Sequence, residues 1–283
     1  MAAKDARAIR VPPKTKVDLT KYDPGDTHGI THEKADERLA KLGAEFATVQ
    51  ELFYGAAHQS VLIVLQGMDT SGKDGTITHV MAPINPQGCI VSSFKQPTPQ
   101  ELAHDFLWRI HPHAPGKGMI GIFNRSHYED VLVVRVHDLV PKEVWQERYE
   151  LINNFERLLA ESGTIILKFF LHISKNEQEE RLLAREEDKT KAWKLSAGDW
   201  AERAYWDDYQ RAYEDALGKC STEYAPWYIV PANRKWYRNL AITETILDVL
   251  RPNVNEWQEA LEQRGKEQLE ALRTMRAQSQ AKV

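Results

Sequence analysis

The sequence predicts an α/β protein in which helices cover both faces of a five-stranded parallel sheet. Val61 to Leu65 is a short, continuous apolar run rich in β-branched residues, as is typical of a strand buried on both faces. Further short apolar runs follow it, and stretches with helical spacing of apolar residues separate them. A glycine-rich turn directly follows the first run, at the end of a strand where open α/β sheets bind ligands.

The chain before this first strand contains an arm and a helix. Residues 1–30 carry prolines and glycines without an apolar period, so we expect an extended arm that packs on the body or on a neighbouring subunit. From Glu33 to His58 apolar side chains recur at helical spacing, which predicts an amphipathic helix leading into the strand.

Later elements are predicted by the same periodicities and by their flanking signals. The other four strands are expected at Cys89 to Phe94, Met119 to Phe123, Thr164 to Ile173 and Trp227 to Val230. Thr98, Pro99 and Glu101 form a helix start with a capping box, and that helix should run to about Arg109. Further helices are expected at Thr76 to Met81, Trp145 to Leu159, from Ser174 onward, Trp200 to Leu217, Asn233 to Leu250 and Glu256 to Ala281.

Composition limits the class of protein. No apolar run approaches the roughly 20 residues that span a bilayer, and the N-terminus lacks the apolar segment of a secretory signal. Cys89 and Cys220 stand outside any metal-binding spacing and are expected to be reduced thiols. We therefore expect a cytoplasmic protein without a membrane partner. A net charge of −4 argues against general coating of nucleic acid.

The turn after the first strand has the spacing of a phosphate-binding loop. Gly67 is followed, after four residues, by Gly72 and Lys73, so several backbone N–H groups can face one anion that Lys73 also reaches. We call residues 67–75 the phosphate loop. Its members, all candidates for phosphate or nucleotide binding, are Gly67, Met68, Asp69, Thr70, Ser71, Gly72, Lys73, Asp74 and Gly75.

The phosphate loop departs from the usual motif at its eighth position. Asp74 stands where a Ser or Thr hydroxyl normally binds the metal, so an ordinary glycine-rich turn is the alternative interpretation. Asp69 and Asp74 favour phosphate binding, because two carboxylates beside an anion need a hard cation between them. Mg²⁺ is the expected cation, with Mn²⁺ as its substitute.

The ends of two other predicted strands supply further candidates. Lys95 and Arg109 follow the second strand and are candidate phosphate contacts, with solvated surface charge as the alternative. Asn124 ends the third strand, where phosphate-loop enzymes commonly have an acidic metal-organising residue. Arg125 follows it and could stabilise charge on a transferring phosphoryl group. Acids return one turn later, where they could also serve only as helix N-terminal carboxylates, and these are Glu129 and Asp130.

A basic segment after the fourth strand, about residues 181–200, predicts a lid over bound phosphates. Arg181 and Arg185 are four residues apart and share one helix face. The alternative is a solvated face, because acidic residues are interleaved. The basic residues considered for phosphate binding here are Arg181, Arg185, Lys189 and Lys194.

Four motifs in the chain carry a family resemblance. GMDTSGKDG, FKQPTPQELAHDFLWRIH, GIFNRSHYEDVLV and REEDKTKAWKLSAGDW resemble the second polyphosphate kinase family, and the likeness runs from about Val17 to Pro252. The resemblance implies the three-layer P-loop kinase fold, with an N-terminal arm (1–30), a kinase domain (31–252) and a helical tail (253–283). Asn124 is similar to the third class of the family, which is associated with phosphorylating nucleoside mono- and diphosphates.

The resemblance also implies roles at matching positions. It assigns phosphate binding to Lys73 and the Gly67–Gly72 backbone, metal binding to Asp69 with Asp74 as second candidate, charge neutralisation to Arg125, and polyphosphate contacts to Arg181 and Arg185. The departure at Asn124 gives more of the metal-binding role to Asp69, or else Glu129 and Asp130 compensate.

The implied activity is reversible, Mg²⁺-assisted transfer of the terminal phosphoryl group of inorganic polyphosphate to ADP or AMP, or to guanine analogues, yielding ATP from ADP. Phosphoryl transfer needs mainly positioning and charge neutralisation, which fits a site of Lys, Arg and Asp. The family resemblance implies a homo-oligomer, commonly a tetramer. Two alternatives remain: an ATP-dependent nucleoside monophosphate kinase, and a non-catalytic nucleotide-binding scaffold that uses the tail helix.

Overall fold

The computed structural model describes residues 7–187 and 197–280, which form a six-stranded sheet in the order β1-β6-β5-β2-β4-β3. The strands are β1 (Ile9–Arg10), β2 (Ser60–Gln66), β3 (Cys89–Ser93), β4 (Ile120–Asn124), β5 (Thr164–His172) and β6 (Trp227–Pro231). The pairs from β3 to β6 are parallel, as predicted, with β2 in the middle.

The predicted number of five strands was too low by one. β1 comes from the N-terminal arm and pairs antiparallel with β6, so that Ile9 lies opposite Ile229. Two residues are too few to show an alternating pattern, and the pairing partner lies more than 200 residues away in the sequence. Other arm residues, among them Val11, Val17 and Leu19, are buried against the body.

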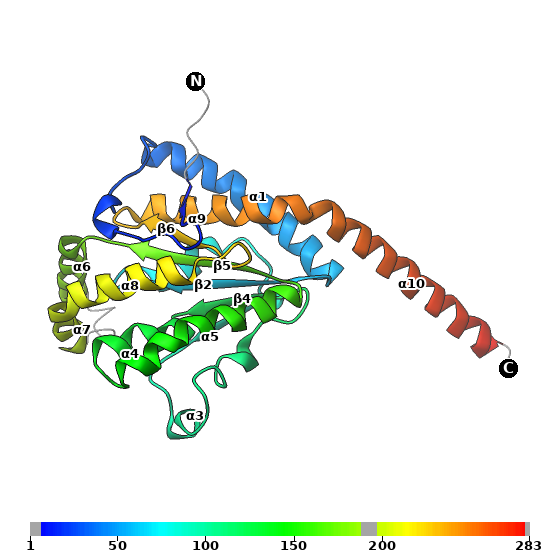
Figure 1. Ribbon diagram of the computed structural model, residues 1–283. Coiled ribbons are helices and arrows are strands. Elements are labelled where there is room, and N and C mark those ends of the chain that lie inside the picture. The colour runs from blue at the N-terminus through cyan, green and yellow to red at the C-terminus, as the bar shows by residue number, and fades with distance from the viewer. Residues whose placement is uncertain (1–6, 188–196, 281–283) are drawn as a thin grey trace.

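Helices cover both faces of the sheet (Figure 1). One face carries α1 (His32–Ala56), α2 (Lys73–Val80) and α9 (Lys235–Leu250), and α9 contacts the other two. The other face carries α4 (Val133–Val136), α5 (Lys142–Glu161) and α8 (Trp206–Cys220). The remaining helices are α3 (Pro99–Leu102), α6 (Lys175–Glu187), α7 (Ala197–Glu202) and α10 (Val254–Gln280).

Two predicted helix starts are confirmed, and one predicted helix end is wrong. Thr98 and Glu101 form the expected capping box at α3, and the Ser174 Oγ accepts from the Glu177 N–H at 3.1 Å at α6. However, α3 ends at Leu102 instead of reaching Arg109. The Asp105 carboxylate accepts the backbone N–H of Leu107 at 3.0 Å, and such a local side-chain bond competes with helix hydrogen bonding.

Lys168 of the apolar β5 forms a fully buried ion pair with Glu156 of α5. The Lys168 ammonium donates to Glu156 at 2.5 Å, to the Tyr128 hydroxyl at 2.8 Å and to the Cys220 carbonyl at 2.7 Å. Lys168 and Glu156 are fully buried. Burial alone would raise the pKa of Glu156, but the charge of Lys168 and hydrogen bonds from His127 and Lys168 hold that pKa below its ordinary value. The positive charge of Lys168 inside this strand is therefore neutralised by the Glu156 carboxylate.

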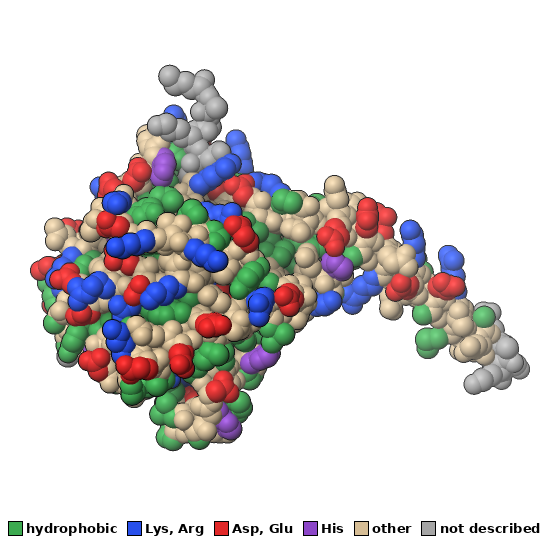
Figure 2. Space-filling view, in the orientation of Figure 1, with side chains coloured by type: hydrophobic (Ala, Val, Ile, Leu, Met, Phe, Trp, Pro, Cys, Tyr) green, Lys and Arg blue, Asp and Glu red, His purple; other side chains and the backbone are tan. Residues whose placement is uncertain are grey.

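The long helix α10 leaves the body after its first turns (Figure 1). Trp257 is buried against Phe53, with ring centroids 4.9 Å apart, and later residues are largely exposed. Within the described residues, no helix combines the length and apolar character that crossing a membrane would require. Figure 2 shows acidic and basic side chains interleaved over the face in view, so on this face positive charge is not gathered into one broad patch.

Candidate active site

The phosphate loop lies where β2, β4, β5 and β6 end, at the same edge of the sheet. Gly67 opens it with φ 154°, and a side chain there would place its Cβ 2.8 Å from the Leu171 carbonyl oxygen. Gly72 precedes α2 with φ 101°. Both positions therefore require glycine. Thr70 also has a positive φ, of 63°, which is a strained conformation typical of functional loops.

The end of the phosphate loop forms the first turn of α2, which has no side-chain cap. The first intrahelical bond of α2 is from the Thr76 N–H to the Gly72 carbonyl at 2.9 Å, and Gly72 supplies no side-chain cap. The N–H groups of the first helical turn therefore lack helical acceptors, which makes the turn suited to an anion. Among the described residues, the buried hydroxyls of Thr70 and Ser71 also have no hydrogen-bond partner.

Lys73 lies inside the phosphate loop and is buried. Its ammonium donates to the carbonyl oxygens of Gly67 at 2.8 Å and Met68 at 3.3 Å. Burial and then the charge of Arg125 lower the pKa of Lys73 to about 8. The ammonium is thus held by neutral carbonyl groups while a second cation lies nearby, an arrangement that favours an incoming anion.

Asp69 and Arg125 pair across the ends of β2 and β4. Arg125 donates to Asp69 at 2.7 Å and to Glu129 at 3.4 Å. Its φ of 62° is in the left-handed region, and its N–H donates to the Leu65 carbonyl at 3.1 Å. The neighbouring carboxylates raise the pKa of Arg125 although burial opposes them. The structure thus brings together three predicted site residues beside the phosphate loop.

Asn124 contacts the other acid of the phosphate loop. Its amide donates to Asp74 at 2.9 Å. An acidic residue at position 124 would instead face the Asp74 carboxylate, and two like charges at this distance repel unless a cation separates them. The amide therefore makes Asn124 and Asp74 compatible without a second ion between them.

Asp199 on α7 is a site neighbour to which no role was assigned from the sequence. It accepts from Arg185 at 3.2 Å. Burial and then the charge of Asp69 raise the pKa of Asp199 above its ordinary value. Asp199 belongs to the SAGDW motif, so that motif was the available signal. The motif thus places the Asp199 carboxylate and its partner Arg185 near Asp69.

Arg181, predicted as a lid residue on polyphosphate, instead has its guanidinium buried in this structure, with its donors engaged by the protein. Its Nη1 donates to the Thr70 carbonyl at 2.9 Å and the Ser71 carbonyl at 3.1 Å. Its Nη2 donates to the carbonyls of Ala232 and Asn233, and its Nε to Glu177 at 2.7 Å. All five N–H donors of the guanidinium are used, so Arg181 fixes the positions of the Thr70 and Ser71 carbonyl groups in the phosphate loop.

Two other contacts on this side were missed in the sequence. The Gln178 amide donates to the Asp69 carbonyl at 3.1 Å. Arg238 of α9 is buried, with its guanidinium against Gly72. One signal was present: Arg238 is a charged residue within a helix whose following residues are otherwise nearly all uncharged.

Among the described residues, the remaining candidates Lys95, Arg109 and Asp130 form no hydrogen bond or ion pair with the phosphate loop. Arg109 donates to the Lys95 carbonyl at 2.7 Å and pairs with Glu101 at 3.5 Å, which supports a structural role. Asp130 pairs with Arg148 at 2.9 Å, and burial raises the pKa of Asp130 to about 6. Lys189 and Lys194 lie outside the described residues.

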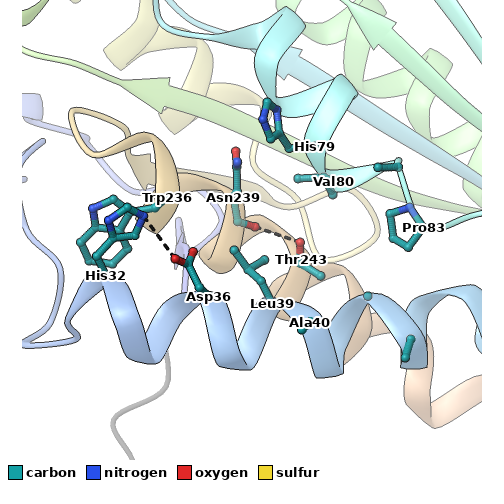
Figure 3. A pocket seen from close by; sticks show the side chains of 13 residues that line it. His32, Asp36, Leu39, Ala40, His79, Val80, Pro83, Trp236, Asn239 and Thr243 are labelled. Atoms are coloured by element: carbon teal, nitrogen blue, oxygen red, sulfur yellow. Dashed lines mark hydrogen bonds and ion pairs between the residues drawn. The ribbon is translucent and has the colours of Figure 1, made fainter.

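A cavity of about 630 Å³ lies between α1, α9 and the C-terminal end of α2 (Figure 3). His32 and Trp236 stack at its rim with ring centroids 5.3 Å apart, and Asn239 points into it. None of the predicted site residues lines this cavity. It is therefore distinct from the phosphate loop.

Comparisons with known proteins identify the family. The family model described as Polyphosphate kinase 2 (PPK2) matches residues 29–258. The chain is 53% identical over 246 residues to a Meiothermus ruber protein named AMP/ADP-polyphosphate phosphotransferase, covering 86% of this chain and 92% of that protein. It is 43% identical over 277 residues to a Rhodopseudomonas palustris protein named ADP-polyphosphate phosphotransferase, covering 93% of this chain and 96% of that protein.

A solved structure agrees with the sequence comparison. The crystal structure of polyphosphate kinase 2 from Arthrobacter aurescens TC1 superposes with a TM-score of 0.84 at 44% identity, covering 89% of this chain and 92% of that chain. The predicted layered α/β fold is thereby confirmed, apart from the added strand β1. With the phosphate loop and its cations in place, the chain belongs to the polyphosphate kinase 2 family.

Proposed function

We propose that the protein transfers the terminal phosphoryl group of inorganic polyphosphate to AMP and ADP. The observation that carries this proposal is the phosphate loop itself, where the first turn of α2 has no side-chain cap, two buried hydroxyls have no partner among the described residues, and the Lys73 ammonium is buried against backbone carbonyls. The names of the Meiothermus ruber and Rhodopseudomonas palustris relatives support this choice of donor and acceptors.

The chemistry follows from charge and position. An acceptor phosphate oxygen is already ionised, so no general base has to remove a proton from it. The phosphate loop holds phosphates by its N–H groups and Lys73, and Arg125 neutralises charge on the phosphoryl group as it moves in line from donor to acceptor. Since both sides of the reaction are phosphoric anhydrides or esters bound by the same groups, the transfer is reversible.

A Mg²⁺ ion fits the donor set beside the phosphate loop, with Mn²⁺ as its substitute. Asp69 and Asp74 would hold it, and the ion would offset charge on phosphate oxygens when bound. Among residues 7–187 and 197–280, no group of three or more His, Cys, Asp or Glu side chains is arranged as a metal site. Mg²⁺ commonly takes one or two carboxylates and completes its shell with water and phosphate oxygens.

The Asn124–Asp74 contact supports the use of both acceptors. Asn124 is the residue by which the sequence resembles the class associated with mono- and diphosphates, and its amide engages Asp74 at 2.9 Å. The relative with 53% identity carries both acceptors in its name. Guanine nucleotides are proposed as further acceptors, because the family resemblance implies them.

One coupled assay separates the proposal from its two alternatives. Purified protein is incubated with Mg²⁺ and AMP, ADP, GMP or GDP, each with short or long polyphosphate, and triphosphate formation is followed. ATP formed from ADP and polyphosphate supports the proposal. Conversion of ATP and AMP to ADP without any use of polyphosphate would favour a conventional nucleotide kinase. Nucleotide binding without turnover under any condition would favour a scaffold.

We also propose that the chain forms a homo-oligomer, with a tetramer as the expected state. Val144, Leu151 and Leu158 recur every seven residues along α5 and are 42%, 48% and 52% exposed. Apolar side chains at this spacing form a stripe that water covers poorly, and a partner helix can bury it. Light scattering during size-exclusion chromatography tests this, and a monomeric mass at micromolar concentration would contradict it.

A further inference from the structure

Arg238 is a buried guanidinium without a matching acid. Its side chain comes from α9 and is only 2% exposed. Within the described chain, no carboxylate forms an ion pair with it. Burial and then the charge of Arg181 lower the pKa of Arg238 to about 10, and no group opposes this shift. A buried charge left unpaired is costly, so its presence calls for a compensating charge supplied from elsewhere.

A neutral amide holds this guanidinium in place. The Asn239 side-chain oxygen accepts from Arg238 Nε at 3.1 Å and from Nη2 at 2.8 Å. A carboxylate of the same shape would make the same two contacts and cancel the charge. Asn239 also lines the cavity between α1, α2 and α9, where its side chain projects between Trp236 and α2 (Figure 3). The contact therefore fixes the position of the guanidinium and leaves its charge intact.

The Arg238 guanidinium packs closely against Gly72 and Gly75 of the phosphate loop. A Cβ on Gly72 would lie 1.9 Å from Arg238 Nη1, and one on Gly75 would lie 3.4 Å from Nη2. Arg181 Nη1 is 3.8 Å from the same Gly72 Cβ position. Two guanidinium groups thus lie together at the start of α2, and only Arg181 has an acidic partner, Glu177.

The two arginines have different roles at the Ser71–Gly72 peptide unit. Arg181 holds the Ser71 carbonyl at 3.1 Å, and a trans peptide directs its N–H opposite to its C=O. The Gly72 N–H is therefore turned away from Arg181, toward the side where an anion would bind. Arg238 adds an uncancelled positive charge next to Gly72, and such a charge acts strongly through a low-dielectric interior.

We propose that Arg238 is a buried, uncompensated positive charge that contributes to phosphate binding. Asn239 holds its guanidinium without neutralising it, so that phosphates bound in the loop become its counter-ion. The inference rests on the proposed function, because it requires a phosphate in the loop. It extends that function by adding Arg238 as a positioning residue that acts through the backbone of Gly72, and Asn239 as the residue that keeps Arg238 available.

The first test removes the charge. Arg238→Met keeps a long side chain, and Arg251→Met removes the same charge from the surface, where Arg251 pairs with Glu45. Affinity for tripolyphosphate with Mg²⁺ is measured by calorimetry, and the melting temperature of the free protein is measured beside it. Arg238→Met should bind tripolyphosphate at least tenfold more weakly, with an equal or higher melting temperature. Arg251→Met should bind within twofold of the unaltered protein.

The second test cancels the charge without removing it. Asn239→Asp retains an oxygen for both Arg238 contacts and adds a carboxylate. Asn154→Asp is the control, because Asn154 also accepts from an arginine, Arg157 at 3.1 Å, but on the exposed face of α5. Asn239→Asp should raise the melting temperature of the free protein and weaken tripolyphosphate binding at least fivefold. Asn154→Asp should leave the affinity unchanged.

The outcomes separate this inference from the proposed function. A merely structural Arg238 would be strengthened by Asn239→Asp, so unchanged or tighter tripolyphosphate binding in that variant overturns the inference. Unchanged binding in Arg238→Met overturns it as well, while polyphosphate-dependent ATP formation in the unaltered protein still upholds the proposed function. If the unaltered protein binds neither tripolyphosphate nor ADP, both fall together.

Discussion

Lys168 and Arg238 are both buried cations, and they are compensated in opposite ways. Lys168 has a carboxylate at 2.5 Å, a hydroxyl and a carbonyl around one ammonium. Among the described residues, Arg238 has only the neutral oxygen of Asn239 as a hydrogen-bond partner. Lys168 lies in the sheet, away from the phosphate loop, and Arg238 lies against it.

The comparison separates two kinds of buried charge, those that stabilise the fold and those that are available to a ligand. A charge matched within the fold contributes to the folded state and is unavailable to a ligand. A charge left unmatched beside a binding loop destabilises the free protein and becomes favourable only when an anion arrives. Five predictions on four residues, ordered by expected effect, test how far this distinction holds.

Lys168→Met should give the largest effect, because it leaves the Glu156 carboxylate buried without its cation. Breaking a buried pair in this way costs about 3–5 kcal/mol of folding free energy. Urea unfolding measures the loss. The double variant with Glu156→Gln removes the stranded charge and should recover a large part of it. A single variant as stable as the unaltered protein would show that the pair is not what holds this part of the core.

Lys73→Met should lower polyphosphate-dependent ATP formation by about 10²–10³-fold, the usual effect of removing one group that stabilises transition-state charge. Since burial already disfavours the Lys73 ammonium, the free protein should melt at an equal or higher temperature. ATP formation is followed by luminescence and melting by calorimetry. Retained activity would move the reaction away from the phosphate loop.

Arg181→Lys should lower activity by about 10–100-fold, because an ammonium cannot replace a planar fork that holds four carbonyls and Glu177. Since Arg181 shapes the phosphate loop, use of short and of long polyphosphate should fall equally. Steady-state kinetics with both donors measures this. A selective loss with long polyphosphate would restore the lid role that the sequence predicted.

The pH dependence should report Lys73. Its pKa in the folded protein is about 8, below the ordinary value, so the free enzyme holds the ammonium below pH 8 and loses it as pH rises. The kcat/KM for polyphosphate should therefore fall about tenfold per pH unit above this point. Lys73→Arg, which keeps its charge, should be slower but flat over the same range. An unchanged alkaline limb in Lys73→Arg would assign the limb to another group.

Arg185→Ala should give the smallest effect. Arg185 is partly exposed and paired with Asp199 at 3.2 Å, so its charge is already screened and shared. We expect a loss of about three- to tenfold with long polyphosphate, less with short polyphosphate, and a loss that shrinks as salt increases. Competition kinetics between the two donors measures the ratio. An equal loss for both would contradict a contact with the polyphosphate chain.

Local signals predicted much of this molecule. The spacing of Gly67, Gly72 and Lys73 placed the phosphate loop, and apolar runs placed the parallel strands within one or two residues. Thr98 and Glu101 predicted the start of α3, because a capping box is complete within four residues. These features depend on neighbours along the chain, which a single sequence displays.

The missed features depend on contacts between distant segments. The β1–β6 pairing joins residues more than 200 apart. Arg181 shares the expected helix face with Arg185, but only the fold shows that this face meets the carbonyls of Thr70 and Ser71. Arg238 reaches the phosphate loop from α9. Its charge in a largely uncharged stretch singles it out, but the sequence does not show what it contacts. Helical spacing gives the direction of a side chain relative to its helix, and tertiary packing decides what it touches.

The helix α10 has a practical consequence. It carries the described chain out to Gln280, away from the body and from the edge of the sheet that holds the phosphate loop (Figure 1). Its outer part is exposed, with Met275 66% accessible. A bead, an electrode or a fused fluorescent protein attached to the outer part of α10 would lie far from the phosphate loop. The enzyme could therefore be immobilised in one orientation for continuous ATP regeneration.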